Sequence, residues 1–170
     1  MPARQSLPRL WLMTDERLGD RLLEAVAGLP EDAGIVFRHY SLAEAARRAL
    51  FERVRKAAPG PVILAGSAAL ASTWGADGSH GRHRRATTAP AHSLAEIRAA
   101  EEAGAALIFL SPVFATRSHP GAPALGPDGF ATLAGRSSLP VIALGGMNAA
   151  RAKILSGAYG WAGIDAFLPA

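Results

Sequence analysis

The feature that most constrains the fold of this chain is a regular alternation between short apolar runs and longer amphipathic stretches. The apolar runs have the lengths of buried strands and span residues 9–15, 34–40, 61–66, 76–81, 86–93, 105–114, 140–146 and 160–167. Strands that read as continuous apolar runs, separated by helices, are typical of a parallel sheet covered on both faces. The sequence therefore predicts an α/β protein whose strands run in one direction.

The number of predicted strands favours a closed barrel over an open, doubly wound sheet. We predict an α/β fold of the (β/α)8 TIM barrel type, with one domain that covers residues 1–170. Only the run "RHRR" (82–85) separates the fourth and fifth predicted strands, and the sequence ends shortly after the eighth. Because parallel crossovers usually need roughly a dozen residues, we expect a barrel that is shortened at helices 4 and 8.

Three polar residues mark the expected starts of helices. Ser41 is followed by Glu44 and Ser93 by Glu96, and this three-residue spacing is that of a capping box. Asn148 directly precedes the helix expected after the seventh strand, where its side chain suits an N-cap. These positions fix where the helices should leave the ends of their strands.

The composition of the chain excludes several kinds of chemistry and limits where in the cell the protein is expected. The chain has no cysteine, which excludes a disulfide framework, a thiolate metal site and a cysteine nucleophile. No apolar run reaches the roughly 18–20 residues needed to cross a bilayer, and residues 1–17 read as a first strand rather than a signal peptide. We therefore expect a cytoplasmic protein without a membrane partner.

The chain is basic, with a net charge of +4, a pI of about 10.3 and 16 arginines against two lysines. We attribute the overall excess to a GC-rich genome and give functional weight only to arginines at strand ends. The run "HGRHRR" (80–85) lacks interleaved aromatic residues, so we predict no nucleic-acid partner. A metal site built from His80, His83 and His92 lacks supporting ligands, and we predict none from these residues.

In a barrel of this class the chemistry takes place on the loops that follow the strands. The residues expected there are rich in arginine, histidine, hydroxyl groups and glycine, which indicates an anion site, most simply one for phosphate. Gly145 and Gly146 follow the seventh strand, where backbone amides can approach a phosphate closely. The alternative is that the two glycines only allow a tight turn, and their position in the barrel favours phosphate.

Four motifs in the same order resemble the superfamily of thiamine phosphate synthases and thiazole tautomerases. The segment "LSPVFATRSHPG" (110–121) resembles the synthase signature in which a strand ends G-P-V-F-P-T-x-T-K. The weaker matches are "LWLMTD" (10–15), "GADGSHG" (75–81) and "VIALGGMN…GAYGWAGIDAF" (141–167). The resemblance covers nearly the whole chain, and the segment at 110–121 is its most specific part.

The resemblance implies a transferase that joins hydroxymethylpyrimidine pyrophosphate to thiazole phosphate and releases pyrophosphate. It also implies Mg²⁺ at the leaving group, no organic cofactor, and small phosphorylated heterocycles as the only ligands. Positions carried over as catalytic are Arg38, Thr116, Ser118 and His119. Positions carried over as binding the substrate or its phosphate are His92, Ser93, Arg117, Gly145, Gly146, Gly163, Ile164 and Asp165.

The chain departs from this pattern at charged positions. Gly66 and Ser67 stand where the family has Asn-Asp, and the fourth strand is followed by basic residues only, so the usual ligands of Mg²⁺ are absent and we predict no metal-binding residues. His119 replaces a lysine, and Asp165 replaces a serine where a carboxylate would repel phosphate unless an arginine pairs with it. The tautomerases' catalytic histidine is Pro112 here.

These departures leave two hypotheses open beside the synthase. In the first, Arg82, Arg84, Arg85 and Arg117 neutralise pyrophosphate without a metal; the alternative is that the run 82–85 is only a solvated connecting loop. In the second, the chain is a catalytically degenerate or tautomerase-like relative that binds a phosphorylated thiazole or thiamine compound without the coupling reaction. Because shortened barrel faces would expose apolar strand surface, we also expect a homodimer.

Overall fold

The computed structural model describes residues 7–117, 120–121 and 123–168. Its centre is a closed barrel in which each strand pairs in parallel with its neighbours in sequence, and the first strand pairs with the last. The strands are β1 (Leu10–Met13), β2 (Gly34–Phe37), β3 (Val62–Ala65), β4 (Gly78–His80), β5 (Thr88–Ala91), β6 (Leu107–Leu110), β7 (Val141–Ala143) and β8 (Gly160–Gly163). This architecture confirms the predicted (β/α)8 barrel.

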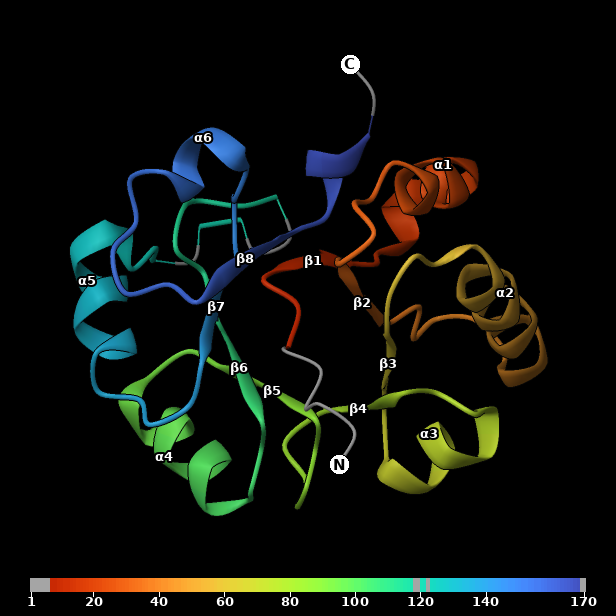
Figure 1. Cartoon of the computed structure of the whole chain (residues 1–170), viewed down its shortest axis with the longest axis horizontal. Helices are drawn as coiled ribbons and strands as arrows, with labels where there is room; N and C mark the ends of the chain where they lie inside the picture. The colour runs from red at the N-terminus through yellow and green to blue at the C-terminus, as the bar shows by residue number, and fades with distance from the viewer. Residues whose placement is uncertain (1–6, 118–119, 122, 169–170) are drawn as a thin grey trace.

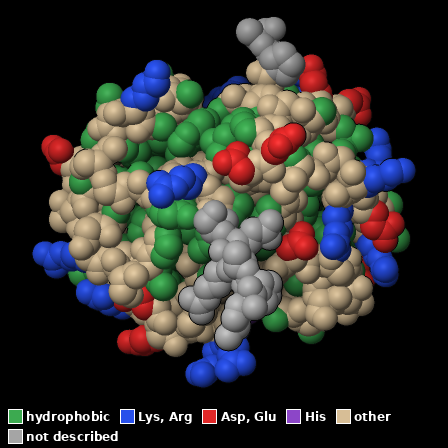
Figure 2. Space-filling model, in the orientation of Figure 1, with side chains coloured by type: hydrophobic (Ala, Val, Ile, Leu, Met, Phe, Trp, Pro, Cys, Tyr) green, Lys and Arg blue, Asp and Glu red, His purple; other side chains and the backbone are tan. Residues whose placement is uncertain are grey.

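Helices surround the ring of strands, as Figure 1 shows. They are η1 (Glu16–Arg21), α1 (Leu22–Ala27), α2 (Glu44–Ala57), α3 (Ala68–Trp74), α4 (Leu94–Glu102), α5 (Gly126–Ala134), α6 (Ala149–Ala152) and η2 (Asp165–Phe167). None of the helices in the described ranges is long and apolar enough to cross a membrane. In the view of Figure 2, basic and acidic side chains are interspersed around the periphery of this face.

As predicted, no helix joins β4 to β5. Residues 81–87 connect β4 to β5 without a helix, and the backbone N–H of Arg85 donates to Ala103 O at 2.7 Å, which holds this loop against the end of α4. After β8 the described chain forms only the short helix η2, whose Phe167 ring stacks on Trp161 with 5.4 Å between ring centres. The connection between β4 and β5 therefore lies close to the barrel wall.

Bulky side chains fill the barrel, and small residues opposite them make room. Trp11 is 1% exposed and meets Phe109 edge to face, with 5.5 Å between ring centres. Gly34 is the first residue of β2, and a Cβ atom there would lie 2.4 Å from the Trp11 ring. Large residues packed against small ones give the rigid interior that positions the loops above it.

The expected helix starts are confirmed at two positions and wrong at the third. The side chain of Ser93 accepts from the N–H of Glu96, and that of Asn148 accepts from the N–H of Arg151. Helix α2, however, begins at Glu44 with Ala43 as its N-cap, so Ser41 does not cap it. The N–H of Ser41 instead donates to Glu16 Oε1 at 2.8 Å, because the loop after β2 packs against η1.

Candidate functional site

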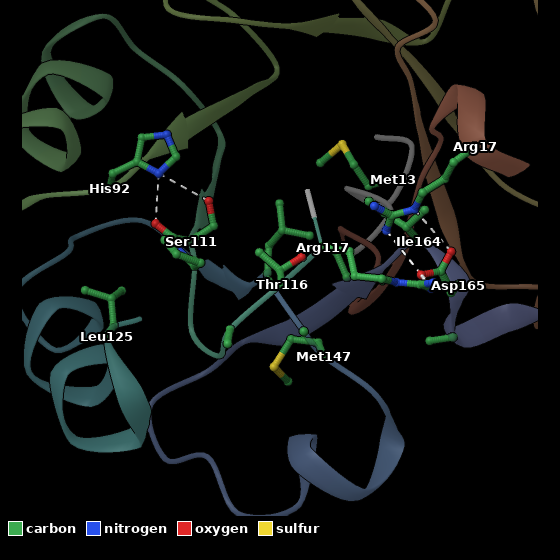
Figure 3. Close-up of a pocket in the computed structure, with 18 of the residues that line it drawn as sticks. Met13, Arg17, His92, Ser111, Thr116, Arg117, Leu125, Met147, Ile164 and Asp165 are labelled. Carbon is green, nitrogen blue, oxygen red and sulfur yellow. Dashed lines mark hydrogen bonds and ion pairs between the residues drawn. The ribbon is translucent and has the colours of Figure 1, made fainter. Parts of the chain in front are cut away.

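A cavity of about 530 Å³ opens at the end of the barrel where the strands finish. Figure 3 shows it between an arginine–aspartate cluster on one side and the His92–Ser111 pair on the other. The walls come from the loops after β1, β2, β5, β6, β7 and β8, and comprise Met13, Arg17, Arg38, His92, Ser111, Pro112, Ala115, Thr116, Arg117, Pro123, Leu125, Leu144, Gly145, Gly146, Met147, Ala162, Gly163, Ile164, Asp165 and Ala166.

Most of the residues predicted for the site from sequence meet in this cavity. Those that line it are Arg38, His92, Thr116, Arg117, Gly145, Gly146, Gly163, Ile164 and Asp165. Ser93 is not among the lining residues, because its hydroxyl is used to cap α4, and the geometry gives its predicted binding role no support. Ser118 and His119 lie outside the described residues.

Arg38, at the end of β2, is held in one orientation by two acceptors. Its Nε donates to Thr14 O at 2.7 Å, and its Nη2 donates to Asp15 Oδ2 at 2.7 Å. Burial lowers the pKa of Arg38 from its ordinary value, and the charge of Asp15 opposes that shift. Arg47 of α2 donates to Arg38 O at 2.8 Å and to Ala65 O at 2.6 Å, which ties the ends of β2 and β3 together.

Asp165 is paired with two arginines across the mouth of the cavity. Arg117 Nη2 donates to Asp165 Oδ2 at 2.6 Å, while Arg17 donates through Nε at 3.3 Å and through Nη2 at 3.2 Å. From the sequence, this carboxylate is expected to repel phosphate unless an arginine pairs with it, and that pairing is present. Arg17 was missed as a site residue, because it follows β1 by four residues and nothing in the local sequence indicates that η1 carries it back to the mouth.

The glycine pair after β7 is required by close packing. Gly145 has φ +98° and Gly146 has φ +61°; a Cβ on Gly145 would lie 2.7 Å from Pro112 Cα, and one on Gly146 would lie 2.6 Å from Ala115 O. These contacts support the tight-turn reading. Within the described residues no protein acceptor faces the N–H groups of Gly145 and Gly146, so they can still donate to an anion.

His92 lies on the side of the cavity opposite Asp165 (Figure 3). Its Nδ1 is 2.8 Å from Ser111 O, a carbonyl that can only accept, so Nδ1 carries a proton and Nε2 of the neutral ring is an acceptor. His80 and His83 are engaged elsewhere, His80 with Thr88 Oγ1 at 2.9 Å and His83 with Gly66 O at 3.0 Å. No cluster of three or more metal-ligating side chains occurs in the described part of the chain.

The residues at the ends of β3 and β4 do not fit Mg²⁺. Gly66 brings no side-chain oxygen, and its carbonyl accepts from His83, while the hydroxyl of Ser67 caps α3 by accepting from the N–H of Leu70 at 3.1 Å. Asp165, the acidic residue among those that line the cavity, is taken by arginines. A hard dication that prefers carboxylate oxygens therefore finds poor ligands here.

The basic run 82–85 does not line the cavity, so the geometry favours a connecting loop over the hypothesis that the run binds pyrophosphate there. Arg82 pairs with Glu96, in the first turn of α4, at 3.2 Å and is not among the residues that line the cavity. Arg84 and Arg85 lie in the same connecting loop and are likewise absent from the cavity walls. Of the four arginines grouped on sequence grounds, only Arg117 lines the cavity.

The fold and the site define a (β/α)8 barrel with an arginine- and glycine-lined cavity at the ends of its strands, a class whose members commonly bind phosphorylated ligands there. A match over residues 10–167 to the family described as thiamine monophosphate synthase shows that this chain belongs to that family.

Two curated relatives agree with this family. The chain is 44% identical over 80 residues to a putative thiamine-phosphate synthase 2 of Aquifex aeolicus, a stretch that covers 46% of this chain and 43% of the relative. It is 37% identical over 83 residues to a thiamine-phosphate synthase of Chloroflexus aurantiacus, covering 47% of this chain and 38% of the relative. The matched stretches thus span about two-fifths of each relative.

Solved structures share the fold. A thiamine phosphate pyrophosphorylase from Pyrococcus furiosus superposes with a TM-score of 0.79 at 22% identity, over 95% of this chain and 87% of that one. A 2-keto-3-deoxy-6-phosphogluconate aldolase of Zymomonas mobilis gives a TM-score of 0.65 at 12% identity, over 94% and 82% of the two chains. At these identities the similarity establishes the architecture alone.

Proposed function

We propose that this chain is a cytoplasmic thiamine-phosphate-synthase-type transferase that joins hydroxymethylpyrimidine pyrophosphate to thiazole phosphate. The observation that carries the proposal is the convergence of Arg38, Thr116 and the loops after β7 and β8 on one cavity. In the family's pattern the first two serve the pyrophosphate and the loops serve the thiazole phosphate. A chain in which these segments pointed apart would have no place for both substrates.

The two sides of the cavity suit the two parts of such a ligand. Arginine side chains and glycine amides are suited to phosphate oxygens, because charged donors and close backbone N–H groups bind them well. Met13, Leu125 and Met147 provide apolar wall for a heterocyclic ring. The Nε2 of His92 offers an acceptor to a ring amino or hydroxyl group.

The proposed reaction needs stabilisation of a departing pyrophosphate. Arg38 is suited to this task, because Asp15 and Thr14 O already fix its guanidinium group and little reorganisation is needed when charge develops. Since the usual Mg²⁺ ligands are absent, we propose that arginines neutralise the pyrophosphate without a protein-bound metal. A titration calorimetry experiment with pyrophosphate, with and without Mg²⁺, tests this point, and strictly metal-dependent binding would contradict it.

The test of the reaction is direct. The protein is incubated with hydroxymethylpyrimidine pyrophosphate and thiazole phosphate, and thiamine phosphate is sought by mass spectrometry. We expect a molar amount of product that exceeds the molar amount of enzyme. In an Arg38→Gln variant the rate of product formation should fall at least about tenfold. If no product forms over many hours, with or without Mg²⁺, the transferase proposal fails.

A second candidate function is binding of a phosphorylated thiazole or thiamine compound without coupling. The specific observation in its favour is that Asp165 stands where the family has a serine and occupies two arginines of the cavity. The two functions are separated by measuring the affinity for thiamine phosphate in the same preparation. Tight binding of thiamine phosphate together with an absent coupling reaction identifies the second.

A further inference from the structure

Three loops that are distant in the sequence are joined at the mouth of the cavity by one carboxylate. Asp165 follows β8, Arg117 follows β6, and Arg17 belongs to η1 after β1. Figure 3 shows the two guanidinium groups directed at the carboxylate from different sides. We call this group of three side chains the Asp165 bridge, and all three line the cavity.

The carboxylate of the Asp165 bridge takes the donors that suit a phosphate. Arg17 approaches it through Nε and Nη2 at 3.3 and 3.2 Å, which is the fork arrangement that a guanidinium group also uses toward two phosphate oxygens. Arg117 adds a shorter contact of 2.6 Å from Nη2. A phosphate entering the mouth must therefore compete with Asp165 for both arginines.

The bridge is accessible enough for such an exchange. The side chains of Arg17, Asp165 and Arg117 are 29%, 35% and 80% exposed. Ion pairs at that level of exposure are weak in water and are readily replaced. The donors of Gly145 and Gly146 line the same cavity, so a displacing anion gains contacts that the carboxylate does not make.

We propose that Asp165 is a specificity determinant that acts as an internal competitor for the phosphate position. This inference rests on the proposed function, in which the cavity binds a phosphorylated heterocycle. Because each ligand must displace a carboxylate, an anion gains only if it carries more charge or more oxygens than a carboxylate does. Phosphate esters and pyrophosphate meet this requirement, while carboxylate compounds and the unphosphorylated alcohol do not.

Titration calorimetry with inorganic phosphate and with pyrophosphate tests the proposal in the wild-type chain and in two variants. Asp165→Asn keeps the shape and removes the charge, and Asp165→Ser installs the residue that the family pattern has there. We expect both variants to bind each anion about tenfold or more tightly than the wild type, because the anion then no longer competes with the Asp165 carboxylate for Arg17 and Arg117. Acetate should bind measurably to the variants and not to the wild type.

The control is Glu52→Gln, which changes the net charge by the same amount. Glu52 pairs with Arg48 on the exposed side of α2 and is absent from the cavity walls. An equal gain in affinity in this control would mean a general charge effect and would overturn the proposal. Circular dichroism is used to check that all three variants retain the wild-type fold.

The remaining outcomes separate this inference from the proposed function. If the wild type binds phosphate or pyrophosphate but Asp165→Asn and Asp165→Ser bind them equally or more weakly, Asp165 does not compete, and the inference fails while the phosphate site stands. If neither the wild type nor any variant binds inorganic phosphate, pyrophosphate or thiazole phosphate, the proposed function fails and takes this inference with it.

Discussion

Asp15 and Asp165 both lie at the mouth of the barrel, and both accept hydrogen bonds from arginine side chains. Asp15 accepts from Arg38 at 2.7 Å, and Asp165 accepts from Arg117 at 2.6 Å. A carboxylate that neutralises an arginine is a poor ligand for a cation, since the same oxygens cannot serve both well. At the level of single residues, the mouth is therefore organised around guanidinium groups.

Replacement of Arg38 by lysine tests whether the fixed guanidinium matters or only its charge. Lysine cannot donate to Thr14 O and Asp15 at once from a planar group, so we expect Arg38→Lys to weaken pyrophosphate binding about tenfold. Calorimetric titration measures the change. The matched control is Arg48→Lys on the exposed side of α2, which should bind as the wild type does. Equal affinities for both variants would mean that Arg38 acts as a point charge.

Site residues next to strand ends could be predicted from the sequence, and residues brought in from farther away could not. Arg38 directly follows β2 and Gly145 lies two residues after β7, so the barrel itself places them at the mouth. The position of Arg17 at the mouth depends on the path of η1, where Gly19 has φ +48°. The pairing of Asp165 with its arginines depends on three loops at once. Such long-range geometry leaves no local pattern in the chain.

At the scale of helices, two serines that the sequence predicts as N-caps behave differently in the structure. Ser93 caps α4 because β5 ends two residues earlier and the chain turns directly into the helix. Ser41 lies in a longer loop, where its N–H donates to the Glu16 side chain. Helix α2 therefore starts only at Glu44. The capping pattern thus predicts that a helix follows, while its first residue is decided by what the preceding loop packs against.

Removal of the two hydroxyls should separate these roles. We expect Ser93→Ala to cost about 1 kcal/mol of unfolding free energy because the N–H of Glu96 loses its acceptor. Ser41→Ala should change it by less than about 0.5 kcal/mol. Urea denaturation followed by circular dichroism measures both. Because Ser93 does not line the cavity, its variant should also bind pyrophosphate normally, and a lost affinity would restore the binding role predicted from sequence.

For the whole molecule, closure of the barrel depends on pairing between the two ends of the chain. β8 pairs with β1, and a Cβ on Gly160 would lie 1.8 Å from Arg9 O, so only glycine fits at this junction. The number of strands and their order could be predicted from sequence. The large apolar side chains that are well exposed in the described ranges are Tyr40 and Ile154, and neither belongs to β4, β5 or β8. The homodimer stays a prediction.

His80 links three strands in the barrel interior and should make the stability of the whole molecule depend on pH. It contacts Thr88 of β5 at 2.9 Å and meets Phe109 of β6 edge to face, with 5.5 Å between ring centres. Burial, with smaller contributions from Arg38, Arg82 and His83, lowers the pKa of His80 from 6.5 to about 4. The native state therefore keeps His80 neutral at a pH where the unfolded chain protonates it.

The sign of the effect follows from this difference in proton uptake. Between pH about 6.5 and about 4 the unfolded state binds more protons than the native state, so stability falls as the pH falls. From pH 7 to pH 5 the loss due to His80 should be about 2 kcal/mol. We expect a His80→Gln variant, which keeps a polar group near Thr88 but does not titrate, to lose less than the wild type by about that amount. Urea denaturation of both proteins at pH 7 and pH 5 measures the two losses. Subtracting one loss from the other cancels the contribution of His39, whose pKa burial also lowers. Equal losses in the two proteins would mean that the interior of the barrel admits a protonated His80 at little cost.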